Sequence, residues 1–306
     1  MDCRNDCKKW PGIWSDETGV ALVSTLLIAV LVAILATDLI SRQEIDIRRT
    51  ANTIHTDQAL VLARAMENWA TVLLSRTTKG EELQYLNRTL PPTSVAGGQV
   101  TGHIDDCQGF FNINNLILGS REHQEQSRSQ FRRLLDFCDM PIELEQKLTD
   151  WLHIDLQQCF ADGYEESAPP KYMVTASEVR QLKGFSGKSF ETCLQPLLRA
   201  LPEATLININ TASARLLASL SDNLDLHTAE LLVKSRPEEG YSKVNEFLEQ
   251  DLLAGTGLQK DFLTVNSSYF MVHSETTIGQ GQISLFSLLK KREENIQVLR
   301  RSLGVF

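Results

Sequence analysis

Five acidic side chains gather in one short stretch of the sequence and could supply the oxygen ligands of a metal ion. They are Asp150, Asp155, Asp162, Glu165 and Glu166. Calcium binds about six to eight oxygen atoms, so carboxylates clustered where a helix gives way to a loop suit it. We expect that change around residues 161–163, where a glycine follows Asp162. The pattern indicates a structural calcium site, and a solvated acidic loop is the alternative.

The six cysteines could form disulfides. Cys3 and Cys7 lie close to the N-terminus, and the other four are Cys107, Cys138, Cys159 and Cys193. An even number of cysteines in a domain that faces an oxidising compartment predicts two structural disulfides. Buried free thiols are the alternative. Four cysteines allow three pairings, among which the sequence does not choose, and their spacing does not indicate a zinc site.

No group of residues has the spacing of a catalytic site. The six histidines are scattered, and the sequence contains no G-x-S-x-G, H-E-x-x-H or P-loop motif. We therefore expect a protein that is not an enzyme.

One short motif occurs twice, as Asn-Ile-Asn at residues 112–114 and 208–210. Asparagine side chains favour helix starts because their oxygen accepts a backbone N–H. We expect Asn210 and Thr211 to cap the helix that follows them.

The element that organises the chain is its N-terminal apolar segment. Residues 20–36 carry no charge, in a chain of 306 residues with a net charge of −9. About 20 apolar residues span a bilayer, so the segment predicts one transmembrane helix. A secretory signal peptide is the alternative, but its apolar region is shorter and ends in a small-x-small cleavage site. The acidic balance argues against nucleic acid as a partner.

The helix is expected to continue well beyond the apolar segment. Residues 41–75 contain no proline or glycine, and apolar residues recur with the spacing of one helix face. These residues are Ile47, Ala51, Ile54, Val61, Ala65, Trp69 and Val72. The sequence thus predicts one helix over Val20–Ser75, whose second half packs on a globular domain through this stripe. A coiled-coil stalk is the alternative, but strict heptads are lacking.

A polar leader that ends in glycine before such a helix resembles the type IV pilins and the pseudopilins of type II secretion. The matching residues are Gly19 and the segment VALVSTLLIAVL, which starts at Val20. The resemblance implies that a prepilin peptidase cleaves between Gly19 and Val20. Two features differ: Asp16 and Glu17 lie just before the cut, and Ser24 replaces the usual Glu at the fifth mature position. In pilins this Glu is thought to pair with a neighbour's terminal amine, so a subunit with no neighbour ahead of it needs none.

Ser24 and four further segments make the sequence similar to the minor pseudopilin K family. The segments are residues 41–74 with IRRTAN at Ile47–Asn52, QGFFNINNL at 108–116, DWL at 150–152 and LININTASARLLASL at 206–220. The resemblance implies a subunit that caps the tip of a short periplasmic pseudopilus and helps to start its assembly for protein export. The implied partners are the minor pseudopilins of types I and J, the major pseudopilin, the inner-membrane assembly platform and the prepilin peptidase.

The same resemblance implies a single-pass protein of the inner membrane with its head in the periplasm. It also implies calcium at the acidic stretch, in a segment of the type DW-x-D…G-x-E-D. The match there is partial, because His153 stands where a further acid often lies and Glu166 replaces the last Asp.

In the rest of the chain, the segments with the pattern of strands lie on both sides of a long segment with the pattern of helices. Strands are expected at residues 99–106, 109–116, 269–277, 282–291 and 295–301, with helices over 121–255. Gly279-Gln280-Gly281 predicts a hairpin. The fold class is α+β, a long N-terminal helix on a small antiparallel sheet with a large all-helical domain inserted between strands. The expected boundaries are 1–19 for the leader, 20–90 for the helix, 91–118 and 258–306 for the head and 119–257 for the insertion.

Residues 206–257 also resemble tandem helix-hairpin-helix, or SAM-like, units. Such units hold DNA phosphates on glycine hairpins. The first hairpin here, residues 221–223, has no glycine and contains Asp222, and only Gly255-Thr256-Gly257 keeps the form. We therefore expect the fold without the DNA function. The alternative functions are a DNA-binding protein of an uptake system and a membrane-anchored periplasmic hydrolase.

Overall fold

The structure, a computed structural model, describes residues 17–77, 85–86, 89–158, 172–293 and 295–304, with only the backbone at 17–18 and 154–158. Its α-helices are α1 (Glu17–Arg76), α2 (Arg121–Phe137), α3 (Leu144–Gln158), α4 (Ala214–Ala218), α5 (Leu226–Lys234) and α6 (Val244–Leu248). Its strands are β1 (Thr93–Val95), β2 (Gly98–Asp106), β3 (Phe111–Asn112), β4 (Leu198–Arg199), β5 (Ile207–Asn208), β6 (Leu263–Thr264), β7 (Tyr269–Ile278), β8 (Gly281–Arg292) and β9 (Asn295–Leu303).

The chain forms two compact units, Met1–His55 and Thr56–Phe306. The first contains the N-terminal part of α1, in which the side chains of residues 19–50 are all exposed. The helix is long and apolar enough to cross a membrane, with a mean hydropathy of 2.8 in its most apolar 18-residue window. The predicted helix over Val20–Ser75 is confirmed, since α1 spans Glu17–Arg76. The helix is continuous because no proline or glycine interrupts its backbone hydrogen bonds after Gly19.

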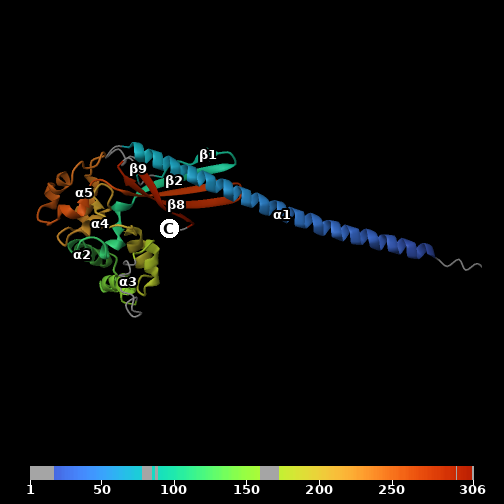
Figure 1. The fold of residues 1–306 in the computed structure, drawn as a ribbon, viewed down its shortest axis with the longest axis horizontal. Helices are drawn as coiled ribbons and strands as arrows, with labels where there is room; N and C mark the ends of the chain where they lie inside the picture. The colour runs from blue at the N-terminus through green and yellow to red at the C-terminus, as the bar shows by residue number, and fades with distance from the viewer. Residues whose placement is uncertain (1–16, 78–84, 87–88, 159–171, 294, 305–306) are drawn as a thin grey trace, which may run out of the picture. The chain divides into compact units, whose positions relative to one another are not determined.

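The second unit contains a five-stranded antiparallel sheet with the order β1-β2-β7-β8-β9 (Figure 1). The predicted hairpin is confirmed, since β7 and β8 pair from Tyr269↔Lys290 to Ile278↔Gly281. Gly279 there has a φ of +51°, a left-handed conformation that glycine adopts without strain. The predicted strands at 99–106 and 295–301 are also found, as β2 and β9.

One face of the sheet packs against the part of α1 that belongs to the second unit. Ile104, Phe270, Val272 and Leu289 of the sheet form a buried cluster with Ala70 and Leu74 of the helix. At Gly102 of β2, a Cβ would lie 2.4 Å from the carbonyl oxygen of His273 on the adjacent strand β7, and 3.1 Å from Met66 Cε of α1. The contact explains the glycine within a strand.

The helix does not pack on the sheet through the predicted stripe. Its buried residues are Ala59, Ala63, Glu67, Ala70 and Leu74. The predicted residues Val61, Ala65, Trp69 and Val72 are exposed, as are Ile47 and Ile54 in the first unit. The prediction was wrong because periodicity locates an apolar face but not its partner, and the face of small residues fits the sheet more closely.

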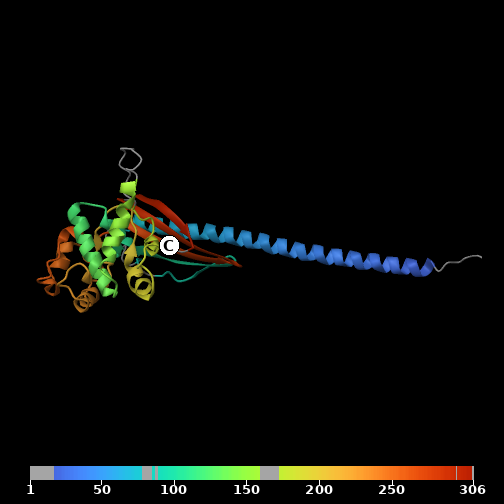
Figure 2. The same ribbon diagram turned by 90° about the horizontal axis from the view of Figure 1, so that it is seen from below.

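The elements between β2 and β7 form the inserted block, which Figures 1 and 2 show gathered at one end of the sheet. Its core contains a row of aromatic rings, Phe111, Phe131, Phe185 and Phe190. The predicted insertion is confirmed because β2 and β7, which flank it in sequence, are adjacent strands. The boundaries 119–257 stay a prediction.

Three local predictions for the block need correction. Residues 109–116 do not form a strand of the large sheet, because only β3 is extended and it pairs with β4 in parallel. A second parallel pair joins β5 to β6, so the block is not purely helical. The segment 190–201 contains a π turn, a 3₁₀ turn and β4 in place of a regular helix. The β3–β4 and β5–β6 pairings are long-range backbone contacts that replace the local preference.

Candidate assembly surface

The predicted processing site lies at the start of α1. Gly19 and Val20 are helical and exposed, and a Cβ at Gly19 would meet nothing within 4 Å. The Ser24 hydroxyl donates to the carbonyl of Ala21 at 3.0 Å, so its polar group is satisfied inside the helix. Position 24 therefore carries no charge that another chain must neutralise. Cleavage after Gly19 and the role of Ser24 in assembly stay predictions.

The inner face of α1, which we define as Ala59, Ala63, Glu67, Ala70 and Leu74, is held to the sheet by one ion pair. Glu67 is 2% exposed, and its two carboxylate oxygens accept from Nε and Nη2 of Arg301, both at 2.8 Å. Ser287 also donates to this carboxylate. Because Ser287 and Arg301 are cross-strand partners on β8 and β9, Glu67 fixes the helix to the last two strands at once.

The same contacts decide the protonation of Glu67. Burial opposes its charge, but the hydrogen bonds from Arg301 and Ser287 outweigh burial and hold the pKa of Glu67 below its ordinary value. The bond to Glu67 likewise raises the pKa of Arg301. The pair is therefore ionised at neutral pH, with bidentate geometry on the carboxylate.

The outer stripe of α1, which we define as Val61, Ala65, Trp69 and Val72, lies on the opposite side of the helix. At about 100° per residue these four residues fall within one narrow sector, roughly half a turn from Ala63 and Ala70. Val61 is 66% exposed, Trp69 42% and Val72 46%. An apolar surface of this kind, which includes an exposed tryptophan, is typical of a binding site for another chain.

A buried carboxylate joins the sheet to the inserted block. Asp106, the last residue of β2, accepts from Asn208 Nδ2 at 2.8 Å, Thr211 Oγ1 at 2.5 Å and the backbone N–H of Gln108 at 2.9 Å. Burial dominates and raises the pKa of Asp106 above its ordinary value, because the donors are uncharged. The contact links β2 to the end of β5 and to the segment that follows it.

The two Asn-Ile-Asn motifs have the same local geometry. The side-chain oxygens of Asn112 and Asn208 accept from the backbone N–H groups of Asn114 and Asn210, at 3.2 and 2.9 Å. These bonds confirm that the motifs cap the backbone that follows them. The expected cap of α4 was wrong, since that helix is capped by Ser213, which accepts from the N–H of Leu216.

The second asparagine of each motif clamps two distant segments. Asn114 bonds both backbone groups of Met173 and the carbonyl of Leu201, at 2.8–2.9 Å. Asn210 bonds both backbone groups of Tyr241 and the carbonyl of Val265, at 2.8–3.1 Å. Each side-chain amide therefore donates both of its N–H groups and accepts one backbone N–H, and each motif joins distant segments of the block by the same set of hydrogen bonds.

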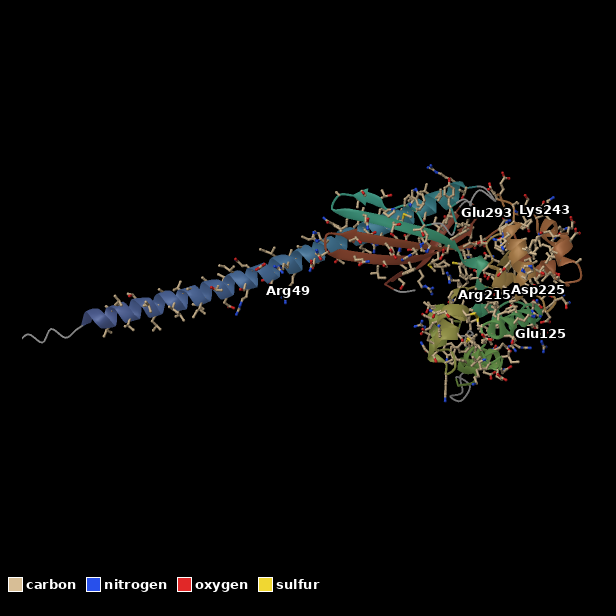
Figure 3. The ribbon with its side chains drawn as sticks, turned by 180° about the vertical axis from the view of Figure 1, so that it is seen from behind. Arg49, Glu125, Arg215, Asp225, Lys243 and Glu293 are labelled. Carbon is tan, nitrogen blue, oxygen red and sulfur yellow. A yellow bond between two sulfur atoms is a disulfide. The ribbon has the colours of Figure 1, made fainter. Side chains whose placement is uncertain are left out.

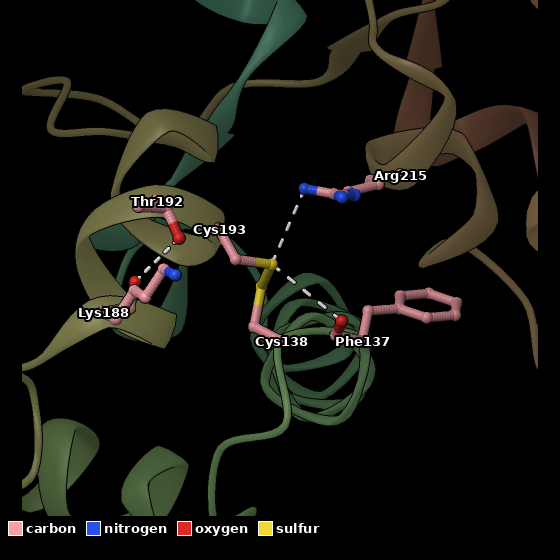
Figure 4. Close-up of a disulfide and its surroundings, with 6 residues drawn as sticks. All are labelled: Phe137, Cys138, Lys188, Thr192, Cys193 and Arg215. Carbon is pink, nitrogen blue, oxygen red and sulfur yellow. Dashed lines mark hydrogen bonds between the residues drawn. A yellow bond between two sulfur atoms is a disulfide. The ribbon is translucent and has the colours of Figure 1, made fainter.

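One disulfide connects the end of α2 to the π turn at Phe190–Leu194. It joins Cys138 to Cys193, with their Cα atoms 5.6 Å apart. Figure 4 shows Arg215 Nη1 pointing at Cys193 Sγ from 3.7 Å. Cys107 is a buried free thiol whose pKa is raised by burial, so the prediction of two disulfides was wrong for this residue. Cys3, Cys7 and Cys159 lie outside the described residues.

The acidic group proposed as a calcium site lies mostly outside the described residues. Asp162, Glu165 and Glu166 fall there, and only the backbone of Asp155 is described, within α3. Asp150 is exposed and accepts from Gln146 Nε2 at 2.7 Å. Within the described part of the chain, no three His, Cys, Asp or Glu side chains come together as a metal site requires.

The first hairpin of the helix-hairpin-helix segment holds an ion pair. Asp222 accepts from Nε and Nη2 of Arg133 at 2.5 and 3.0 Å, so α2 reaches this hairpin. The pairing with Arg133 lowers the pKa of Asp222. Figure 3 shows that the inserted block carries charged side chains of both signs, labelled there as Glu125, Arg215, Asp225 and Lys243.

Sequence reasoning missed Glu67 and Asp106, which connect the sheet to α1 and to the inserted block. Asp106 caps the turn that follows it through the N–H of Gln108, but nothing local shows that it is buried, because its side-chain donors lie about a hundred positions away. Glu67 does give one: it interrupts a row of small residues at helical spacing, Ala59, Ala63 and Ala70. A single acid within a row of alanines indicates a buried charge that needs a partner.

Comparison with protein-family models matches the inserted block. Residues 109–203 and 207–266 each match a model described as type II secretion system (T2SS), protein K. Each matched range opens at or just before one Asn-Ile-Asn motif and contains the clamp that this motif forms.

Similar proteins extend the match to most of the chain. The type II secretion system protein K of Pseudomonas aeruginosa is 32% identical over 94% of this chain and 93% of its own length. That of Aeromonas hydrophila is 27% identical over 94% and 97%. The crystal structure of the GspK-GspI-GspJ complex from the type 2 secretion system of enterotoxigenic Escherichia coli contains a chain of the same fold. It superposes with a TM-score of 0.68 and 23% identity, over 84% of this chain and 100% of that chain.

Proposed function

This chain belongs to the protein K family of the type II secretion system, and we propose that it caps the tip of a short periplasmic pseudopilus and helps to start its assembly. The single observation that supports this most strongly is the inserted block, which lies between adjacent strands of a small head carried on a long helix. Pseudopilin helices pack side by side, so a head enlarged in this way would collide with a subunit stacked beyond it. Only the end of the fibre offers the room.

Ser24 supports the same position. Its hydroxyl bonds to the helix backbone, so this chain offers no carboxylate to the terminal amine of a subunit ahead of it. A subunit that starts the fibre needs no such contact. The role is structural and not catalytic.

We propose that the partners are the minor pseudopilins of types I and J, because a protein K relative forms a complex with GspI and GspJ. The major pseudopilin and the assembly platform of the inner membrane would bind next, during growth of the fibre. The apolar part of α1 would anchor the chain in the inner membrane, with the second unit in the periplasm. A prepilin peptidase would first remove residues 1–19.

Mass spectrometry of the full chain from its native membrane tests the processing step. The expected mature N-terminus is Val20. Gly19→Leu should leave the precursor uncut and abolish secretion, whereas Gly19→Ala, the matched control, should be cut more slowly but still support it. Secretion by a chain that keeps its leader would contradict the proposal that this protein is processed in the way pilins are.

The number of copies tests the tip position. In purified pseudopili we expect about one copy per fibre, which labelling of the second unit would place at an end. Ser24→Glu should not convert the chain into a repeating subunit, because the inserted block still prevents stacking. A ratio near one to one with the major subunit would overturn the proposal.

We also propose that Asp155, Asp162 and Glu165 bind a structural calcium ion together with Asp150 and Glu166. The support is the chemistry of the side chains, since carboxylates are the ligands that calcium prefers. A ligand that binds only the folded chain raises its melting temperature. Chelation should therefore lower the melting temperature of the full chain, and Asp162→Asn should remove this response. A melting curve unchanged by chelator and by added calcium would favour the solvated loop.

A further inference from the structure

Two histidines face each other on the side of the sheet that is turned away from α1. His103 of β2 and His273 of β7 are cross-strand partners, and the centroids of their rings lie 4.9 Å apart. Side chains alternate between the two faces of a strand, and the adjacent residues Ile104 and Val272 belong to the cluster that packs on α1. His103 and His273, which we call the histidine pair, therefore lie on the opposite face of the sheet.

The inserted block reaches the histidine pair through Arg199 of β4. Nη2 of Arg199 lies 3.5 Å from Oδ2 of Asp105, a residue of β2. The same carboxylate oxygen lies 3.7 Å from Nε2 of His103. The Arg199 and Asp105 side chains are 20% and 21% exposed, so water screens these charges weakly. A histidine of the sheet and an arginine of the block thus share one oxygen atom of Asp105.

A second contact joins the histidine pair to the boundary between the sheet and the block. The ring of His273 stacks on that of Phe286 in β8, with centroids 4.2 Å apart and 10° between the ring planes. Phe286 packs against a buried cluster formed by Leu201 of the block with Cys107, Tyr269, Met271 and Leu288. A movement of His273 would therefore act on the packing between the sheet and the block.

Other charged groups on this face are screened or already bound. Glu275 of β7 lies 3.5 Å from Nε2 of His273, but its side chain is 51% exposed, so solvent screens its charge. Further along the face, Arg300 of β9 donates to a backbone carbonyl of the block, and Lys290 of β8 pairs with Glu203. The strongest influence on the histidine pair therefore comes from Asp105 and Arg199.

These neighbours give the two rings different affinities for a proton. Asp105 raises the pKa of His103 above its ordinary value, although burial and Arg199 act in the opposite direction. Burial lowers the pKa of His273, and the charge of His103 lowers it further. As the pH falls, the first proton therefore binds to His103 and the second to His273.

The two partners of His103 have opposite consequences for the block. The favourable interaction with Asp105 lies within β2, so it stabilises the folded chain below about pH 6.5 whether or not the block is in place, and it is lost as the pH rises through the raised pKa of His103. The unfavourable effect of Arg199 exists only while the block is in place. Because coupling free energies are reciprocal, an arginine that lowers the proton affinity of His103 is itself bound less tightly once His103 carries a proton.

The second proton acts through packing. It places two positively charged rings beside each other, and one of these rings stacks on Phe286. Because the pKa of His273 is lowered in the folded chain, its protonation costs stability as the pH falls below about 6.5.

We propose that the histidine pair is an acid-sensitive switch that loosens the contact between the sheet and the inserted block. While both rings are uncharged, Asp105 holds Arg199. The first proton weakens this ion pair, and the second disturbs the packing of Phe286. The switch is a property of the fold that goes beyond the proposed function and does not depend on it.

Titration of the histidines by nuclear magnetic resonance tests the order of the two protons. In the full chain, labelled with ¹³C at histidine Cε1 and held in detergent micelles, we expect His103 to titrate above about pH 6.5 and His273 below it. His103→Gln should raise the pKa of His273, because a positive charge is removed. His273→Gln should leave that of His103 nearly unchanged, because His103 binds its proton while His273 is neutral. The reverse order, or equal effects of the two substitutions, would overturn the proposal.

The free thiol of Cys107 measures the opening of the boundary. Cys107 is fully buried in the cluster that contains Leu201, so a reagent must wait for the boundary to open. The full chain for this measurement carries serine in place of Cys3, Cys7 and Cys159. The rate of labelling by a pyridyl disulfide, divided at each pH by the rate for the unfolded chain, should rise about fivefold as each histidine of the pair is protonated, which is the lower end of coupling between sites.

Single substitutions show whether the histidine pair causes these rises. His103→Gln should remove the first rise, and His273→Gln should remove the second. His227→Gln is the matched control, because His227 is an exposed histidine of α5, and it should keep both. The unsubstituted pair already decides the question: a labelling rate that stays constant between about pH 8 and pH 5, or that changes at other pH values than the two titrations, would overturn the proposal without any histidine variant.

Discussion

The inner and outer faces of α1 between Thr56 and Arg76 differ in the size of their side chains. The inner face has three buried alanines, Leu74 and the buried Glu67. The outer stripe has the larger residues Val61, Trp69 and Val72, all well exposed. The sheet thus takes the face that carries the three alanines and Leu74, and leaves Val61, Trp69 and Val72 exposed.

This difference shows that shape decides which face of the helix is buried. The buried alanines and Leu74 pack against the sheet, and the ion pair of Glu67 with Arg301 ties the helix to the last strand. Close contact of this kind gains dispersion energy that large side chains at the same places would prevent. The larger apolar residues remain available to another chain. The predictions below test this division of roles.

The largest effect is expected at Glu67. Glu67→Ala should lower the free energy of unfolding by about 3 kcal/mol, because it leaves Arg301 and Ser287 without their buried partner. Urea denaturation of the full chain measures this effect. Glu44→Ala is the control on the same helix, since Glu44 forms an exposed pair with Arg48 and should change stability by less than about 0.5 kcal/mol. Equal effects would mean that Glu67 does not anchor the helix.

The next effect comes from one substitution made on both faces. Ala63→Leu should destabilise the chain by about 2 kcal/mol, because the larger side chain separates the helix from the sheet. Ala65→Leu, two residues away on the outer stripe, should stay within about 0.5 kcal/mol. Thermal and urea unfolding give both values. A large loss at position 65 would show that the outer stripe is covered within this chain.

A smaller effect is expected from acid. The pKa of Glu67 is lowered in the folded chain, so the folded state binds fewer protons than the unfolded state between the two pKa values. This stabilisation is complete above the unfolded value of about 4.3 and is lost as the pH falls through the folded value. The free energy of unfolding should therefore fall more steeply with acid in the wild type than in Glu67→Gln. Parallel curves below about pH 5 would contradict the assignment.

The smallest effect on stability is expected at Trp69. Trp69→Ser should change the free energy of unfolding by about 0.5 kcal/mol or less, because the residue is 42% exposed and lies on the face of α1 turned away from the sheet, yet it should reduce secretion. Trp151→Ser is the control, since Trp151 packs against the core of the inserted block and its loss should destabilise the chain measurably. Loss of stability at Trp69 equal to that at Trp151 would remove the distinction between the two faces.

Local sequence was sufficient for the elements whose formation depends on neighbouring residues. The absence of breakers after Gly19 predicted α1, and Gly279-Gln280-Gly281 between alternating residues predicted the β7–β8 hairpin. The Asn-Ile-Asn motif indicated local capping, and Asn112 and Asn208 do cap the backbone two residues further on, although Asn210 and Thr211, the residues named for the cap, do not cap α4. For the acidic group at Asp150–Glu166 the prediction of calcium stays open.

Tertiary structure alone decided what depends on contacts between distant residues. Periodicity showed that α1 has an apolar stripe but could not show that the sheet takes the opposite face, since two faces of one helix differ only in what they meet. The pairing of Cys138 with Cys193, the parallel pairing of β3 with β4, and the bonds of Asp106 to Asn208 and Thr211 join residues more than fifty positions apart. These contacts stabilise the fold only after the long loops between their residues have closed. No local pattern in the sequence specifies which distant segments will meet.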